Sequence, residues 1–227
     1  MLQHFSELID KVKAMPRTVV CVANADSETV EAARMALDEG LADVILYGDE
    51  AVVRPLVGQA GIEGRVELRH AADPATALRE AVRSVRCGES GVLMKGMLNS
   101  SDFLRGVLNK EEGLRTGRRL SHIAAVELPG YHKLIYSTDG GMNINPDLAA
   151  KKDILANALL ALRSWGYECP KVACLAANER VDPHNPATID AAGLVEAWER
   201  GEFPTQCIVE GPIAMDVALN RESALHK

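Results

Sequence analysis

The segment from 91 to 105, GVLMKGMLNSSDFLR, combines residue types that could bind an anionic ligand. Between a strand-like apolar run and a helical pattern it places Lys95, Gly96, Asn99, Ser100 and Ser101, with Arg105 one turn further on. Free N–H groups and the helix dipole favour a phosphate at a helix N-terminus. The spacing matches no Walker or dinucleotide fingerprint. On these residues alone, phosphate binding and an ordinary capped loop both stay open.

A second loop, TDGGMNINPD at 138–147, has similar potential. Gly140 and Gly141 allow a close backbone approach to a ligand, and Asp139 precedes them. Asn143 and Asn145 offer amide donors and acceptors. A tight turn with Asx caps explains the same residues without a ligand.

A third polar stretch, 177–190, follows a strand-like run and contains a histidine and an arginine. Polar residues at such a place often line a cleft, but a lone His184 or Arg180 in a loop is more often solvated surface. We therefore expect surface here.

The elements that position these loops alternate between strand and helix patterns. Strands are expected at 18–23, 43–47, 66–68, 91–94, 171–176 and 206–209. Helices are expected at 2–15, after Asp26 or Ser27, after Asp73, after Ser100 or Ser101, at 150–165, at 190–200 and from 213. Pro55 and Gly58 are interpreted as punctuation. The alternation predicts a parallel sheet covered by helices.

The alternation changes near residue 120. Residues 121–128 and 131–137 are two strand-like runs separated by Pro129-Gly130, which predicts a β-hairpin. We expect an N-terminal α/β domain at 1–124 and a second α/β domain at 125–227.

Composition narrows the possible partners. A net charge of −7 argues against nonspecific nucleic-acid binding, which depends on clustered Lys and Arg. The five cysteines are scattered, mostly in apolar runs, and are expected to be buried and reduced. No second Cys/His pair accompanies Cys169 and Cys174 at zinc-site spacing, so no metal is expected. The sequence shows neither a signal-peptide pattern nor an apolar run that could span a bilayer, and we expect a cytoplasmic protein.

Four phrases resemble those of the phosphate acetyl/butyryltransferase family, phosphate butyryltransferases in particular. They are LMKG at 93–96, TDGGMN at 138–143, PATID at 186–190 and EGPIAMD at 210–216, and they occur in the family's order. Together they extend the resemblance over essentially the whole chain.

The resemblance implies two α/β domains of the isocitrate/isopropylmalate dehydrogenase-like type, with a parallel sheet that has helices on both faces. It implies an active site in the cleft between the domains and a homodimer or larger oligomer. It also implies exchange of an acyl group between coenzyme A and phosphate, by direct thiol attack on the acyl phosphate. Coenzyme A is then a substrate, and no tightly bound cofactor is expected. Ser100, Ser101 and Arg105 become candidate catalytic residues that contact the anionic group.

Related enzymes are expected to continue for about 60 to 80 residues beyond 227, so the second domain would be incomplete. A noncatalytic or regulatory homologue that binds phosphate or coenzyme A is therefore the main alternative. A metal- and nicotinamide-dependent dehydrogenase would need a cluster of Asp ligands, and Asp139, Asp182 and Asp190 form no convincing pattern.

Overall fold

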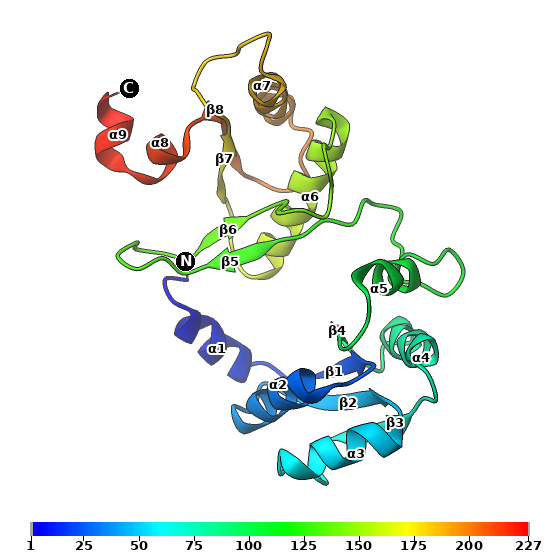
Figure 1. The fold of residues 1–227 in the computed structure, drawn as a ribbon. Coiled ribbons are helices and arrows are strands. Elements are labelled where there is room, and N and C mark those ends of the chain that lie inside the picture. The colour runs from blue at the N-terminus through cyan, green and yellow to red at the C-terminus, as the bar shows by residue number, and fades with distance from the viewer. Residues whose placement is uncertain (1, 227) are drawn as a thin grey trace. The chain divides into compact units, whose positions relative to one another are not determined.

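The computed structural model describes residues 2–226, which form two compact units (Figure 1). The amino-terminal unit is Ser6–Gly117, and the carboxyl-terminal unit joins residues 2–5 to residues 118–226. The amino-terminal unit has one four-stranded sheet, the carboxyl-terminal unit has two two-stranded sheets, and each unit buries its own hydrophobic residues. The domain boundary expected near residue 125 stays a prediction.

The amino-terminal unit is built on a four-stranded parallel sheet with the order β3-β2-β1-β4. Its strands are β1 (Thr18–Ala23), β2 (Ala42–Gly48), β3 (Glu67–His70) and β4 (Val92–Lys95). In the register, Cys21 of β1 lies between Ile45 of β2 and Leu93 of β4. The predicted parallel sheet is confirmed.

Helices cover both faces of this sheet. They are α2 (Ser27–Asp38), α3 (Glu50–Gln59), α4 (Pro74–Arg86) and α5 (Ser100–Val107), and α1 (Phe5–Lys13) precedes them. Because side chains alternate along a strand, Cys21 and Ala23 face α4 and α5, while Val22 faces α2 and α3. These two apolar layers hold the strand ends in fixed positions.

The helix starts in this unit follow the expected capping chemistry. Asp26 caps α2 through the Thr29 N–H, and Asp73 caps α4 through the Thr76 N–H. The interpretation of Pro55 and Gly58 as punctuation was wrong, because both lie within α3. Burial of its apolar face against the sheet stabilises this helix despite the proline.

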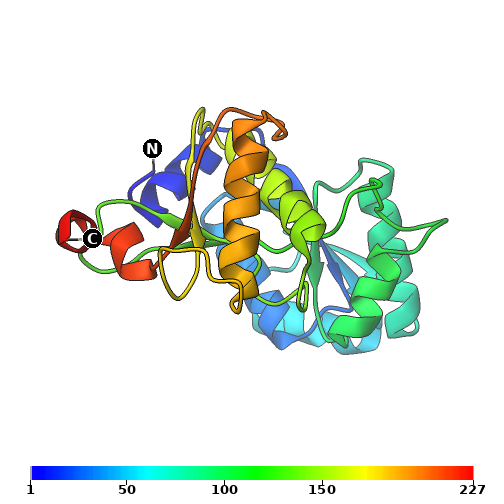
Figure 2. The same ribbon diagram turned by 90° about the horizontal axis from the view of Figure 1, so that it is seen from above.

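The carboxyl-terminal unit contains the expected hairpin, formed by β5 (Ala124–Val126) and β6 (Ile135–Ser137). Both strands are shorter than the sequence suggested. A separate parallel pair joins β7 (Lys171–Leu175) and β8 (Ile208–Ile213). The helices are α6 (Leu148–Ser164), α7 (Pro186–Glu199), α8 (Met215–Leu219) and α9 (Arg221–His226). Figure 2 shows α6 and α7 side by side, and both bury apolar residues against β7 and β8.

Three expected boundaries in this unit were wrong, one of them that of the helix expected from 213, which begins as α8 at Met215. The strand predicted to end at Val209 continues through Gly211 and Pro212 to Ile213, whose carbonyl oxygen accepts from the Ala176 N–H at 3.0 Å. Gly211 is needed there because a Cβ atom would lie 2.6 Å from the Cβ of Cys174. Helix α7 begins at Pro186, earlier than expected, because Asn185 caps it.

The five cysteines are all free, and Cys21, Cys174 and Cys207 are buried as expected. The expectation of burial was wrong for Cys87 and Cys169, which are exposed because they follow helix ends rather than lie inside strands. Within residues 2–226, no helix has the length and apolar character needed to cross a bilayer.

Candidate functional site

The first candidate segment lies where the winding of the amino-terminal sheet reverses. From β1 the chain moves outward to β2 and β3, and then crosses back to β4 on the other side of β1. Ligands of open α/β sheets bind outside the carboxyl ends of the strands at such a switch point. Lys95 ends β4 at this edge, and the β4–α5 loop (residues 96–99) leads directly to Ser100.

Gly96 makes a close backbone contact between the ends of β1 and β4. Its N–H donates to the Ala23 carbonyl at 2.9 Å, and the Met97 N–H donates to the Asn24 carbonyl at 2.9 Å. A Cβ atom on Gly96 would lie 2.1 Å from the Asn24 carbonyl oxygen. A glycine is therefore required to hold the β4–α5 loop against the sheet.

The amino terminus of α5 is open. Asn99 occupies the cap position without a capping hydrogen bond from its side chain, and Ser100 and Ser101 are the first two residues of the helix. The expectation that a serine caps α5 was wrong, because both serines lie inside the first turn. Among the residues that the structure describes, neither serine hydroxyl has a hydrogen-bond partner, and both residues are exposed. Two hydroxyls and uncapped N–H groups are thus available to an anion.

The cations of this segment already have partners. Lys95 Nζ donates to the Leu98 carbonyl at 2.9 Å, so it fastens the β4–α5 loop. Arg105 Nη1 donates to Asp102 Oδ1 at 2.7 Å, and its side chain is 76% exposed. An ion pair this exposed contributes little, about 0.2 to 1 kcal/mol. An incoming phosphate can therefore compete with Asp102 for Arg105.

The second candidate segment, the 138–143 loop, belongs to the carboxyl-terminal unit and is organised around Asp139. Asp139 Oδ1 accepts from the N–H groups of Gly141 at 3.0 Å and Met142 at 2.8 Å. Asp139 Oδ2 accepts from the His122 N–H at 3.2 Å and from Asn143 Nδ2 at 2.7 Å. The carboxylate therefore joins the glycine turn to the strand-like segment before β5.

The environment keeps Asp139 ionised. Partial burial would raise its pKa, but the hydrogen bonds from Gly141, Asn143, Met142 and His122 together outweigh burial and lower the pKa to about 2. A carboxylate with four donors around it is a poor partner for phosphate. Its position makes it a support for the loop.

Asn143 extends the same network. Its Nδ2 also donates to the Leu120 carbonyl at 3.0 Å, and its Oδ1 accepts from Arg119 Nη1 at 3.2 Å. Asn157 of α6 donates to the Arg119 carbonyl at 2.7 Å and so ties the segment to a helix. Sequence reasoning missed Arg119 and Asn157 because their partners are distant in the chain.

The backbone of the glycine turn faces solvent. Gly140 and Gly141 are exposed, and within the described part of the chain the Gly140 N–H has no hydrogen-bond partner. Gly141 has a φ of 152°, which side chains rarely adopt, so a glycine is needed there. The structure brings Asp139, Gly140, Gly141 and Asn143 together within the carboxyl-terminal unit. Lys95, Gly96, Asn99, Ser100, Ser101 and Arg105 are brought together within the amino-terminal unit.

The third polar stretch has structural roles. Thr188 is fully buried, and its hydroxyl bonds to the backbone of Asp182 and Asn185. Asp190 pairs with Lys151 at 2.6 Å, and Asp182 Oδ1 accepts from the His184 N–H. Across residues 2–226, no group of three His, Cys, Asp or Glu residues is placed to hold a metal ion.

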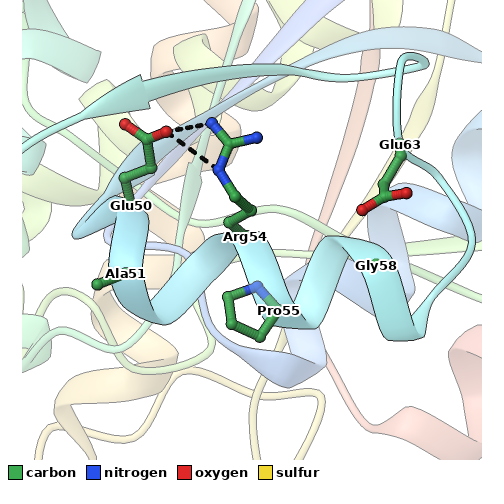
Figure 3. Close-up of a pocket in the computed structure, with 6 residues that line it drawn as sticks. All are labelled: Glu50, Ala51, Arg54, Pro55, Gly58 and Glu63. Atoms are coloured by element: carbon green, nitrogen blue, oxygen red, sulfur yellow. Dashed lines mark hydrogen bonds and ion pairs between the residues drawn. The ribbon is translucent and has the colours of Figure 1, made fainter.

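Two surface hollows involve none of the candidate residues. One, of about 340 Å³, lies along α3, where Figure 3 shows Glu50 paired with Arg54 and Glu63 facing the end of the helix. The other, of about 560 Å³, lies in the carboxyl-terminal unit beside Cys169, Trp198 and Cys207. The first is shallow and its arginine is neutralised, so we assign no ligand to it.

Comparison with known proteins identifies the family of the chain. A family model described as "Phosphate acetyl/butaryl transferase" matches residues 56–227. The chain belongs to the phosphate acetyl/butyryl transferase family. The resemblance drawn from the four sequence phrases is thereby confirmed.

The similar proteins include both phosphate butyryltransferases and phosphate acetyltransferases. The phosphate butyryltransferase of Clostridium acetobutylicum is 40% identical over 229 residues, which cover 100% of this chain and 76% of the relative. The phosphate acetyltransferase of Rhizobium meliloti is 36% identical over 226 residues, with 97% of this chain and 70% of the relative covered.

The crystal structure of a branched-chain phosphotransacylase from Enterococcus faecalis V583 matches with a TM-score of 0.82 and 28% identity. The match covers 92% of this chain and 73% of that chain. The α/β fold with a helix-covered parallel sheet is therefore that of a phosphotransacylase.

Proposed function

We propose that this chain transfers an acyl group, butyryl or acetyl, between coenzyme A and inorganic phosphate. The observation that carries the proposal is the open amino terminus of α5 at the switch point of a parallel sheet, where two serine hydroxyls have no partner among residues 2–226. The names of the relatives support the same substrates. A hydrophobic pocket separates acyl chains by only about 1 to 3 kcal/mol per methylene, so both acyl groups belong in the test.

In this proposal Ser100, Ser101 and Arg105 are the catalytic contacts. The serine hydroxyls and the first N–H groups of α5 donate to the phosphoryl oxygens, and Arg105 balances their charge. Lys95, Gly96 and Asn99 contribute to the binding of phosphate or coenzyme A by shaping the loop that presents these donors.

We assign the 138–143 loop to substrate binding as well. The exposed N–H of Gly140 and the backbone of Gly141 are its proposed contacts with phosphate or coenzyme A. Asp139 and Asn143 hold that backbone in place, because their hydrogen bonds stay within the loop and its neighbouring segment.

The chemistry needs no covalent enzyme intermediate. The sulfur of coenzyme A attacks the carbonyl carbon of the acyl phosphate, so a C–S bond forms and the C–O bond to phosphate breaks. The thiol proton ends on the departing phosphate. Holding both reactants in place contributes several kcal/mol, on the order of 7 or more. Donors at the phosphate stabilise the charge that develops on the leaving group.

The proposal also covers the cofactors, the cellular location and the oligomeric state. Coenzyme A and phosphate act as substrates, without a tightly bound cofactor, in the cytoplasm. We propose a homodimer or larger homo-oligomer. Neither nucleic acid nor a membrane takes part, in keeping with the net charge of −7.

The test is phosphate-dependent thiol release from butyryl-CoA and acetyl-CoA, measured for the wild type and for Arg105→Ala. Arg54→Ala is the matched control, because Arg54 is also an exposed helix residue in an ion pair, on α3. We expect release by the wild type and the control, and a loss of roughly 10- to 100-fold in kcat/KM for Arg105→Ala. No release from folded wild-type protein would favour a noncatalytic homologue that binds phosphate or coenzyme A.

Ser100→Ala and Ser101→Ala test the hydroxyls without harming the fold. Alanine is the better helix former, and neither serine caps α5, so stability should not fall. Each variant should raise the KM for phosphate. Unchanged kinetics in both would remove the hydroxyls from the proposed site.

A further inference from the structure

The turn that follows β1 has an unusual backbone conformation. Asn24 has a φ of 58°, a region that few residues other than glycine adopt and that asparagine tolerates. Its neighbour Ala25 donates its N–H to the Tyr47 carbonyl at 2.9 Å, which ties the turn to the end of β2. The half-buried side chain of Asn24 is therefore fixed in direction from both sides.

That side chain reaches across to the β4–α5 loop. Asn24 Nδ2 donates to the Met97 carbonyl at 2.6 Å, while the Met97 N–H donates back to the Asn24 carbonyl at 2.9 Å. The carboxamide does not cap α2, because Asp26 does so. Its donor joins two loops that lie about 70 residues apart in the chain.

The two hydrogen bonds between Asn24 and Met97 lie close to the first turn of α5, because only Leu98 and Asn99 separate Met97 from Ser100. Met97 is followed by Leu98 and Asn99, and the Leu98 carbonyl is already held by Lys95 Nζ. With both carbonyls fixed, the direction in which Ser100 and Ser101 present their donors is fixed too. Without the Asn24 side-chain bond, the loop would keep its backbone bonds to the end of β1, but the Met97 carbonyl would lose its donor.

We propose that Asn24 is a positioning residue that sets the orientation of the phosphate-binding start of α5. The proposal rests on the proposed function of that helix end. Asn24 need not touch substrate, because it acts through Met97. Misplacing a binding group by about 1 Å can cost on the order of 100-fold in rate, so loss of this bond should be measurable in kinetics.

Two substitutions isolate the carboxamide. Asn24→Gly keeps the positive φ and removes the donor. Asn24→Asp keeps the shape but turns a carboxylate oxygen toward the Met97 carbonyl oxygen, which repels it. Asp73→Ala is the control for general destabilisation, because it removes the cap of α4, and the hydrogen bonds of the Asp73 side chain are with Thr76 of the same helix.

The experiment combines steady-state kinetics of phosphate-dependent thiol release with amide hydrogen exchange of a peptide that covers 96–103. We expect about a tenfold rise in the KM for phosphate in Asn24→Gly, a larger rise in Asn24→Asp, and faster exchange in that peptide for both. The control should lower the Tm and leave both the KM and the exchange of this peptide unchanged.

Unchanged exchange at 96–103, or faster exchange with an unchanged KM, would overturn the positioning role. A fully folded wild type without phosphate-dependent release would instead refute the proposed function. The exchange rates would then still decide whether Asn24 orders the start of α5.

Discussion

Replacement of Asp139 by asparagine tests whether this carboxylate supports the 138–143 loop. Asparagine keeps the shape of the side chain, and its oxygen can still accept from Gly141 and Met142. Its amide nitrogen would then face two other donors, the His122 N–H and Asn143 Nδ2, at distances of 3.2 and 2.7 Å in the native structure. The variant therefore loses two hydrogen bonds to a charged acceptor, and the His122 N–H and Asn143 Nδ2 donors then face the amide nitrogen of the new asparagine, which is also a donor.

The expected cost follows from these two bonds. A hydrogen bond to a charged group contributes about 1.5 to 3 kcal/mol, but water can replace part of it at a half-exposed site. We therefore expect a loss of about 2 kcal/mol for Asp139→Asn. In a chain of this size, that loss lowers the Tm by roughly 4 to 8 °C.

The pH dependence provides an independent check. The folded pKa of Asp139 is about 2, below its ordinary value of 3.8, so its stabilising contribution is complete above about pH 4 and is lost as the pH falls toward 2. The Tm difference between wild type and Asp139→Asn should be constant from neutral pH down to about pH 5 and shrink below pH 4.

Differential scanning calorimetry over that pH range is the assay. Asp147→Asn is the matched control, because Asp147 caps α6 through the Ala150 N–H and asparagine caps equally well. A Tm for Asp139→Asn within about 1 °C of wild type at neutral pH, or a Tm difference as large at pH 2.5 as at neutral pH, would refute the role of the carboxylate as a loop support.

Three further substitutions test the backbone contact at Gly96, the helix α3 and the ion pair of Glu89 in the amino-terminal unit. Gly96→Ala should destabilise by about 1 to 3 kcal/mol or more, since its Cβ would lie 2.1 Å from a backbone oxygen; wild-type thermal stability would contradict this. Gly58→Ala should stabilise α3 by about 0.5 to 1 kcal/mol in chemical denaturation, because the contact at 3.1 Å is with the flexible end of Glu63; a loss would show that Glu63 cannot move. Hydrogen bonds from Arg69 and, to a lesser extent, from Ser84 lower the pKa of Glu89 from 4.5 to about 2. Glu89→Gln should therefore have a lower Tm than wild type at neutral pH, and this difference should shrink only below about pH 4.5.

Local patterns predicted most of the fold. The structure contains the strand expected at Thr18–Ala23, because an apolar, β-branched run on both faces is typical of a strand that is buried in a parallel sheet. Helix α3 could not be predicted in this way. Pro55 and Gly58 both argue against a helix locally, and only the burial of Val53 and Val57 against the sheet outweighs them.

The candidate loops were found from residue types, but the partners of their side chains were not predictable. Asp139 was grouped with binding residues because a charged residue beside two glycines suggests a ligand site. Its donors include the His122 N–H, which a loop pattern cannot place beside it. Asn24 was missed for the same reason, since nothing near it in the sequence indicates Met97 as its acceptor.

Charged side chains that look like ligand groups in the sequence are largely engaged within the protein. Lys95 holds the Leu98 carbonyl, and Asp139 holds the glycine turn. Among the candidate residues that the structure describes, the donors left without a partner are the hydroxyls of Ser100 and Ser101 and backbone N–H groups such as that of Gly140. Such groups are held by the backbone and need little reordering when an anion arrives, which is the property that electrostatic preorganisation requires. In a chain with a net charge of −7, fixed local donors can attract phosphate where the overall field cannot.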